Sequence, residues 1–320
     1  MPNNRKTYNE MYIPLIALLV ALVMMISFLV GLLKFPRVVV DVENSSETST
    51  ESSLDVVESS DISDDTLSEN ASVTEDKETT YYKNFDFVDV SVSNREVANG
   101  CLAVIKETNK YFPIVGEDKL LNIYANKTPQ KYDLSGVALD VQESAFSSFD
   151  SLFVKYSESV GTPKIIVKNA YLNNGAASNG SLDLSTGFSL EINSIPDEKV
   201  TFLREQSYKY GIIQRYPSGK DMYTGYAADS SVYRYVGAGH SYYMNYYKYC
   251  LEEYLDKIRI EKIIEFKSGI ENNTAYAVYY VPMNSSSDTT TVSVPTNENC
   301  SYEISGDGSE GFIVTVKITQ

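Results

Sequence analysis

A single histidine, His240, limits the catalytic chemistry available to this chain of 320 residues. Catalytic zinc sites usually combine imidazoles with a carboxylate and leave one position open for water. Serine and cysteine nucleophiles are commonly activated by an imidazole. No Gly-x-Ser-x-Gly sequence is present, and the three cysteines, Cys101, Cys250 and Cys300, lack metal-ligand spacing. His240 is expected to be a hydrogen-bonded structural residue, with a role in function as the open alternative, because its charge can change near neutral pH.

The elements that would position a site are indicated by residue patterns between residues 81 and 258. Apolar residues at helical spacing from Leu139 to Tyr156 predict an amphipathic helix that ends before Gly161. Strands are predicted at "PKIIVKNAYL", "LDLSTGFSLEI", "IIQRYP" and "VYRYVG". Helices are predicted at "DEKVTFLREQSYKYG", with Asp197 as N-cap, and over "SYYMNYYKYCLEEYLDKIRI", with Cys250 as a small core residue.

The segments "AYAVYYVP", "TTTVSVP" and "EGFIVTVKI" predict a small antiparallel β subdomain over residues 259–320. Helices and strands are mixed rather than strictly alternating, so the expected fold class is α+β. The main domain should contain a small antiparallel sheet flanked by helices.

The N-terminal region differs in composition from the folded part. Residues 11–33 carry no charge, and about 20 apolar residues suffice to cross a bilayer. "KFPRVVV" follows without a small-x-small cleavage site, so we expect an uncleaved transmembrane anchor after a cytoplasmic segment, residues 1–10. Lysine and arginine counts on the two sides tie and do not fix the orientation.

An acidic segment follows the expected anchor, within the stretch from residue 34 to 80. Residues 41–80 contain 13 acidic residues, one lysine (Lys77) and no aromatic residue. Such a composition buries too little apolar surface to fold, so a solvated stalk is expected. We expect a single-pass cell-membrane protein whose folded domain is extracytoplasmic. The formal net charge of −16 also makes nucleic acid an improbable partner.

The order of motifs between about residue 99 and residue 258 resembles the zinc D-alanyl-D-alanine carboxypeptidases related to the vancomycin-resistance carboxypeptidase. The stretches that carry the resemblance are "FLREQSYKYGIIQRYPSGKDMYTGY", "YRYVG" and "GHSYYMNYYKYCLEEYLDKI". The resemblance implies a D,D-carboxypeptidase-like domain at residues 81–258, and the tail resembles the β extension of membrane-anchored relatives.

The residues that bind zinc in the family are changed at the matching positions. The family motif Ser-x-His-x-x-Gly-x-x-x-Asp corresponds to "LDLSTGFSLE", which keeps Gly187 but has Leu184 for the histidine and Glu191 for the aspartate. The third ligand, a histidine, corresponds to Val232. From these changes we expect the family zinc to have been lost and no cofactor to be required.

The residues that act on substrate in the family are changed as well. The general base, a glutamate, corresponds to Asp229, and the arginine that helps to hold the substrate corresponds to Leu172. Two alternatives remain open if Asp183, Glu191 and Asp229 face one cleft. Oxygen ligands suit Ca²⁺ or Mg²⁺, and paired carboxylates can perform acid–base chemistry.

Tyrosine is concentrated in the second half of the expected domain. Of 26 tyrosines, 13 lie between Tyr208 and Tyr254, and those of "HSYYMNYYKY" are too many for one helix face to bury. Tyrosine suits surfaces that bind peptides or proteins. The expected binding residues, from the family frame and this excess, are Tyr171, Arg215, Tyr216, Tyr233, Tyr235 and His240.

Together these observations predict a degenerate, non-catalytic D,D-carboxypeptidase-like membrane protein that binds cell-wall peptide or an envelope protein. Two alternatives are an active peptidase acting on peptidoglycan stem peptides with a relocated or different metal, and a structural adapter in an envelope complex. A Cys101–Cys300 disulfide is possible from the sequence but unsupported.

Overall fold

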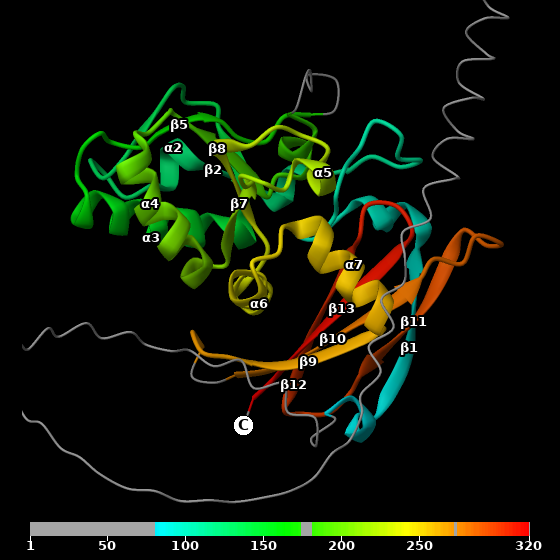
Figure 1. The fold of residues 1–320 in the computed structure, drawn as a ribbon. Helices are drawn as coiled ribbons and strands as arrows, with labels where there is room; N and C mark the ends of the chain where they lie inside the picture. The colour runs from blue at the N-terminus through cyan, green and yellow to red at the C-terminus, as the bar shows by residue number, and fades with distance from the viewer. Residues whose placement is uncertain (1–80, 174–180, 272–273, 320) are drawn as a thin grey trace, which may run out of the picture. The chain divides into compact units, whose positions relative to one another are not determined.

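The computed structural model describes residues 81–173, 181–271 and 274–319, which form two β-sheet modules joined by helices (Figure 1). The first module has a five-stranded sheet in the order β3-β5-β6-β8-β7. Its strands are β3 (Asp133–Leu134), β5 (Ile166–Asn169), β6 (Ser189–Ile192), β7 (Ile212–Tyr216) and β8 (Asp229–Tyr235). Only β3 and β5 are parallel; the other neighbouring pairs are antiparallel.

Two helices, α3 (Glu143–Ser159) and α4 (Asp197–Gln206), pack against this sheet. Their buried apolar residues include Phe149, Leu152 and Leu203, which contact the sheet residues Val167 and Leu190 in one core cluster. The helical spacing in the sequence is therefore confirmed, although α3 begins later than expected. Residues 140–142 instead form β4 (Asp140–Gln142), which pairs with β2 (Leu120–Asn122).

The strand expected over "LDLSTGFSLEI" is shorter than predicted. Residues Ser181–Thr186 form a 3₁₀ helix, and the strand β6 begins only at Ser189. Asp197, the expected N-cap of α4, is its first residue instead, and Pro196 occupies the capping position. Two one-turn helices complete this module, α2 (Ile123–Asn126) and α5 (Asp221–Thr224).

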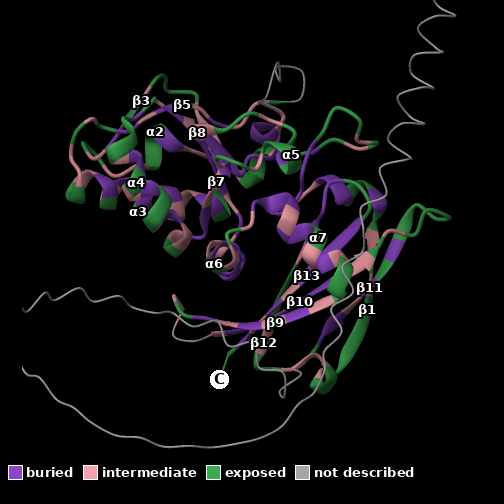
Figure 2. Cartoon of the chain, viewed as in Figure 1, coloured by how far each residue is buried: buried purple, intermediate pink, exposed green. Residues whose placement is uncertain are grey.

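The second module consists almost entirely of strands. A four-stranded antiparallel sheet has the order β12-β13-β10-β9, and its strands are β9 (Ile263–Ser268), β10 (Thr274–Pro282), β12 (Cys300–Gly306) and β13 (Gly311–Ile318). A second pair joins β1 (Phe87–Ser93) to β11 (Thr289–Pro295) in antiparallel register. The module therefore includes chain from before residue 258 as well as after it. Figure 2 shows β1 as a largely exposed strand.

Two helices join the modules, where the sequence pattern predicted one. The helix α6 (Ala238–Tyr247) ends at Lys248, whose φ of 57° is left-handed, and α7 (Leu251–Glu261) starts after Cys250. Cys250 is buried as expected, but it caps α7 rather than lying inside a continuous helix. Tyr243 of α6 and Tyr254 of α7 share a core cluster with residues of β9, β10 and β13.

The approach of α6 to β10 requires a glycine. A Cβ on Gly239 would lie 2.7 Å from the ring of Tyr276, closer than side-chain atoms pack. Because glycine has no Cβ, the helix can contact this ring directly.

The fold class is confirmed as α+β, with a small antiparallel β module at the C-terminal end. Among the described residues, no helix is long and apolar enough to cross a bilayer. The expected anchor at residues 11–33 and the expected stalk at residues 34–80 lie outside the described residues.

His240 connects three elements in the interior. Its Nδ1 lies 2.6 Å from the hydroxyl of Tyr254 on α7, and its Nε2 lies 2.9 Å from Oγ1 of Thr315 on β13. The side chain is buried, and this burial lowers the pKa of His240 from 6.5 to about 4. His240 is therefore a neutral, hydrogen-bonded core residue in the folded chain near pH 7.

This burial predicts a pH dependence of stability. Below about pH 6.5 the unfolded chain binds a proton at His240, whereas the folded chain does so only near pH 4. The stabilisation is therefore lost as the pH falls through this window, with a slope of up to about 1.4 kcal/mol per pH unit. Urea unfolding across this pH range should show the free energy of unfolding falling with pH in the natural chain. The contribution of His240 to this fall should be lost in His240→Gln. Tyr254→Phe, which keeps the imidazole, is the control; an unchanged slope in His240→Gln would contradict the prediction.

Candidate functional site: a carboxypeptidase-like frame with altered residues

The structure brings together two of the three positions that match the family ligands. Glu191 on β6 is the direct cross-strand partner of Val232 on β8. Leu184 lies in the 3₁₀ helix that precedes β6 and is buried, with 3% of its surface exposed. Val232 is 9% exposed. Leu184 and Val232 therefore place apolar side chains at positions that match zinc-binding histidines.

Glu191 is held by a neighbouring strand. Its Oε2 accepts a hydrogen bond of 2.6 Å from Nδ2 of Asn169, its partner across the β5–β6 ladder. The strands β5, β6 and β8 thus fix the carboxylate in the sheet. Its side chain also lines a surface depression of about 550 Å³, together with Lys168, Asp229 and Ser231.

Asp229, the position of the general base, is engaged by its own strand. Oδ1 of Asp229 accepts hydrogen bonds from the backbone N–H of Ser231, at 2.7 Å, and from the Ser231 hydroxyl, at 2.6 Å. These two bonds orient one carboxylate oxygen along β8. Asp229 and Glu191 line the same depression, so the structure does bring these two predicted carboxylates together.

Asp183 does not join them, because it lies in a buried ion network. Its Oδ1 is 2.8 Å from Nε of Arg215 and 3.1 Å from Nη1 of Arg234, and its Oδ2 accepts a hydrogen bond from Ser189. Arg215 also binds both oxygens of Glu252, at 2.7 and 3.1 Å. The condition for the two open alternatives, that Asp183 faces one cleft with Glu191 and Asp229, is therefore not met, since the arginines occupy its carboxylate.

The electrostatics of this network favour the ionised forms. Burial alone would raise the pKa of Asp183, but the charges of Arg234 and Arg215 outweigh it and lower that pKa to about 2. Burial alone would likewise lower the pKa of Arg215, yet Asp183 and Glu252 raise it well above its usual value. The network therefore contains two positive and two negative side chains, all buried: Arg215, Arg234, Asp183 and Glu252.

The residues expected to bind a ligand lie at several different places. Arg215, Tyr216 and Tyr233 are buried, and Arg215 is committed to the ion network. His240 is in the core between the modules. Tyr171 and Tyr235 are partly exposed, and the Tyr235 ring stacks on Phe188 with centroids 6.3 Å apart. The structure does not bring this set to one surface.

The tyrosines of "HSYYMNYYKY" are divided between the core and the surface. Tyr242 and Tyr243 are in the core, and Tyr246 is 42% exposed. Part of the tyrosine excess is therefore exposed, as expected. All three cysteines are free, so Cys101 and Cys300 form no disulfide.

The sequence pattern did not identify the ion network, although one signal for it was present. Arg215 and Arg234 each lie within a strand rich in apolar and aromatic residues, in "IIQRYP" and "VYRYVG". Because charged residues are rarely buried without a partner, such arginines indicate hidden carboxylates. The hydrogen bond from Asn169 to Glu191 has no comparable signal in the sequence.

Comparisons with known proteins support the resemblance seen in the motifs. A D-alanyl-D-alanine carboxypeptidase from Enterococcus faecium is 34% identical over 204 residues. The match covers 61% of this chain and 62% of that protein, which is less than two thirds of its length. No family model matches the chain.

A solved structure shares the fold of this chain. The vancomycin-resistance D,D-dipeptidase VanXYg, solved in complex with a D-Ala-D-Ala phosphinate analogue, has a TM-score of 0.57 and 22% identity. The similarity covers 72% of this chain and 99% of that structure. The predicted resemblance to vancomycin-resistance-type D-alanyl-D-alanine carboxypeptidases is therefore confirmed.

One expectation is corrected by these comparisons, namely that no cofactor is involved. A mutant of the D,D-pentapeptidase VanY from the VanB-type cassette was solved in complex with Zn(II), with 20% identity, a TM-score of 0.37, and coverage of 48% of this chain and 98% of that one. Zinc is the metal recorded with that neighbour, and the expectation that no cofactor is required stands corrected by it.

The side chains at the matching positions do not fit a zinc site built from two histidines and a carboxylate. Only Glu191 offers a ligand atom, since Leu184 and Val232 are hydrocarbon. In the part of the chain that the structure describes, no group of three or more His, Cys, Asp or Glu side chains could hold a metal ion. No step of the function proposed below is therefore assigned to a metal.

The ion network predicts a large loss of stability in Asp183→Asn. The change leaves two buried arginines with one carboxylate, and breaking a buried pair costs about 3–5 kcal/mol. Because the folded pKa of Asp183 is depressed to about 2, its stabilisation is present above about pH 4 and is lost as the pH falls towards 2. Urea unfolding should therefore show a stability difference between Asp183→Asn and the natural chain that narrows over that range.

Ser189→Ala is the matched control for this prediction, because it removes a hydrogen bond to Asp183 but keeps the charge. Its cost should be about 1 kcal/mol. Equal stability of Asp183→Asn and the natural chain near pH 7 would contradict the assigned role of the network.

Proposed function

We propose that this chain is a degenerate D,D-carboxypeptidase-like protein that binds cell-wall peptide and does not hydrolyse it. The observation that carries the proposal is the adjacency of Glu191 and Val232 in paired strands. The sheet still holds the family positions next to each other, while the side chains there no longer supply the family's chemistry. The relatives are peptidases, so the loss of hydrolysis is this chain's departure from them.

Three further features support the loss of hydrolysis. The base position has the shorter Asp229, whose Oδ1 is held by Ser231 and so points along its own strand. The position of the substrate arginine has Leu172, which offers no charge to a substrate carboxylate. The apolar Leu184 is buried where the family has an imidazole.

The surface depression beside these strands retains groups that suit a peptide. Lys168 supplies a cation for a terminal carboxylate, and Asn169, whose Nδ2 donates to Glu191, supplies its Oδ1 as an acceptor. Lys168 is exposed and forms no ion pair with any described residue. Charge and hydrogen-bonding capacity therefore remain where the hydrolytic residues are changed.

We also propose that residues 11–33 anchor the chain in the cell membrane and that residues 34–80 hold the folded domain outside it. The support is the uncharged run and the acidic composition of the two segments. This arrangement would place the depression at the cell wall, where stem peptides lie.

An active peptidase is the second candidate, because Glu191 and Asp229 line one depression. Two nearby carboxylates can share acid and base roles when their pKa values differ. The same experiment separates the two candidates.

The test uses the purified full-length chain in detergent and a peptide ending in D-Ala-D-Ala. The proposal predicts measurable binding by calorimetry, with no release of D-alanine above a protein-free control. Lys168→Gln should weaken binding at least about threefold, since it removes the cation for the peptide carboxylate. Lys155→Gln, an exposed lysine of α3 away from the depression, should not.

Release of D-alanine that Asp229→Asn abolishes would support the peptidase and overturn the proposal. An absence of peptide binding would leave a structural adapter as the better account and would also overturn it.

A further inference from the structure

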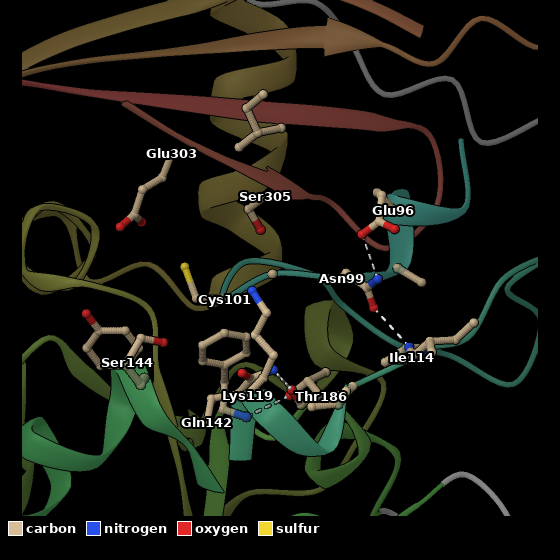
Figure 3. A pocket seen from close by; sticks show the side chains of 18 of the residues that line it. Glu96, Asn99, Cys101, Ile114, Lys119, Gln142, Ser144, Thr186, Glu303 and Ser305 are labelled. Atoms are coloured by element: carbon tan, nitrogen blue, oxygen red, sulfur yellow. Dashed lines mark hydrogen bonds between the residues drawn. The ribbon is translucent and has the colours of Figure 1, made fainter. Parts of the chain in front are cut away.

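A second cavity lies between the carboxypeptidase-like module and the C-terminal β module. Its volume is about 610 Å³, and it is lined by residues from the N-terminal loop region, from α3, from β8 and from β12 and β13. It contains neither Glu191 nor Asp229, so it is separate from the depression described above. Figure 3 shows its side chains converging from the two modules.

Opposite charges enter this cavity from different walls. Lys119, next to β2, extends into it from one side, and Glu303 on β12 reaches in from the other (Figure 3). Within the described part of the chain, neither side chain forms a hydrogen bond or an ion pair, and both are exposed. Because they do not pair with each other, both charges are open to a ligand.

The space between them carries apolar and hydrogen-bonding groups. The stacked rings of Phe188 and Tyr235 line it, with planes 21° apart, and offer a flat surface for a side chain. Gln142 and Ser144, at the start of α3, line the same cavity. Gln142 gives α3 no side-chain cap, and Glu143 in the first turn of the helix adds a carboxylate to this end of the cavity.

The Cys101 thiol contributes no charge to the cavity. It lies 3.5 Å from the carbonyl oxygen of Val236, and burial, with Glu303 assisting, raises the pKa of Cys101 to about 12. The thiol therefore stays protonated near pH 7. Three other carboxylates, Glu96, Asp118 and Glu143, also line the cavity, so among the described residues Lys119 is its single lining cation and Glu303 is one of four lining carboxylates.

The cavity extends along the sheet face. A smaller cavity of about 170 Å³ shares Tyr235, Glu303 and Thr315 with it and continues to Lys317. Lys317 is paired with Glu271 at 3.0 Å, so its charge is already balanced. The elongated space suits an extended chain of a few residues better than a compact single amino acid.

We propose that this junction cavity binds a short zwitterionic peptide, with its terminal carboxylate at Lys119 and its terminal ammonium at Glu303. The site is independent of the depression at Glu191 and requires no hydrolysis. Ion pairs formed in a partly enclosed space are less screened than those on an open surface, so each terminus should contribute to affinity.

The experiment compares three probes on the full-length chain in detergent by calorimetry. Tri-L-alanine carries both terminal charges, its N-acetyl form lacks the ammonium, and its C-terminal amide lacks the carboxylate. Tri-L-alanine should bind at least about threefold more tightly than either capped form. No detectable binding of tri-L-alanine, or equal binding of all three probes, would overturn the proposal.

Variants assign each terminus to its residue. Lys119→Gln should remove the difference between tri-L-alanine and its amide, and Glu303→Gln should remove the difference between tri-L-alanine and its N-acetyl form. The matched controls Lys155→Gln and Glu205→Gln change exposed residues of α3 and α4 that do not line the cavity, and they should bind like the natural chain. Unchanged probe preferences in Lys119→Gln and Glu303→Gln would contradict the assignment.

Lys168→Gln separates this site from the function proposed above, because Lys168 lines only the other depression. If Lys168→Gln binds tri-L-alanine as the natural chain does, the junction site is supported whatever the outcome at the depression. If it alone abolishes the binding, the peptide occupies the depression and the junction proposal is wrong.

Discussion

The buried ion network around Asp183 is the interaction on which the rest of the site depends. Removing charges from water costs several kcal/mol per ion, so these four groups are stable only when each meets its partners. The partners come from four places: the 3₁₀ helix before β6, the strand β7, the strand β8 and the helix α7. Satisfying them fixes the strands relative to one another and to a helix that packs on the C-terminal module.

Under the proposed loss of hydrolysis, this constraint keeps the paired strands of the site in place. Arg234 follows Val232 on β8 and pairs across the sheet with Ser189, which itself binds Asp183. The strands β6 and β8, which carry positions that match the family ligands, are therefore held by groups other than the side chains at those positions. The side chains of Leu184 and Val232 take no part in the ion network. A change at Asp183 or Arg215, in contrast, leaves a buried charge without its partner.

The fold was largely predictable from local patterns. The strand "VYRYVG" and the tail strands β10, β11 and β13 follow from β-branched and aromatic runs between turn residues. Two failures have a physical reason. The break between α6 and α7 depends on the left-handed Lys248, which no helix-breaking residue announces, and the β1–β11 pair joins residues about two hundred positions apart.

The site was predictable in part, and only through the resemblance. Matching motifs put Glu191 and Val232 at ligand positions, and the structure shows that the two residues are partners in the β6–β8 ladder. The place of Asp183 stayed open because a carboxylate adjacent to a ligand position looks the same in sequence whether it faces a cleft or two buried arginines. The junction cavity depends on the contact between modules, which leaves no pattern in either one.

The central claim is that the frame is intact and that residue identity alone separates this chain from its peptidase relatives. The most direct measurement is the release of D-alanine by a chain that carries the family residues again: Leu172→Arg, Leu184→His, Glu191→Asp, Asp229→Glu and Val232→His. With zinc supplied, this variant should release D-alanine from a D-Ala-D-Ala peptide at least about a hundredfold faster than the natural chain. A folded variant that is no faster than the natural chain would show that the frame itself has been lost.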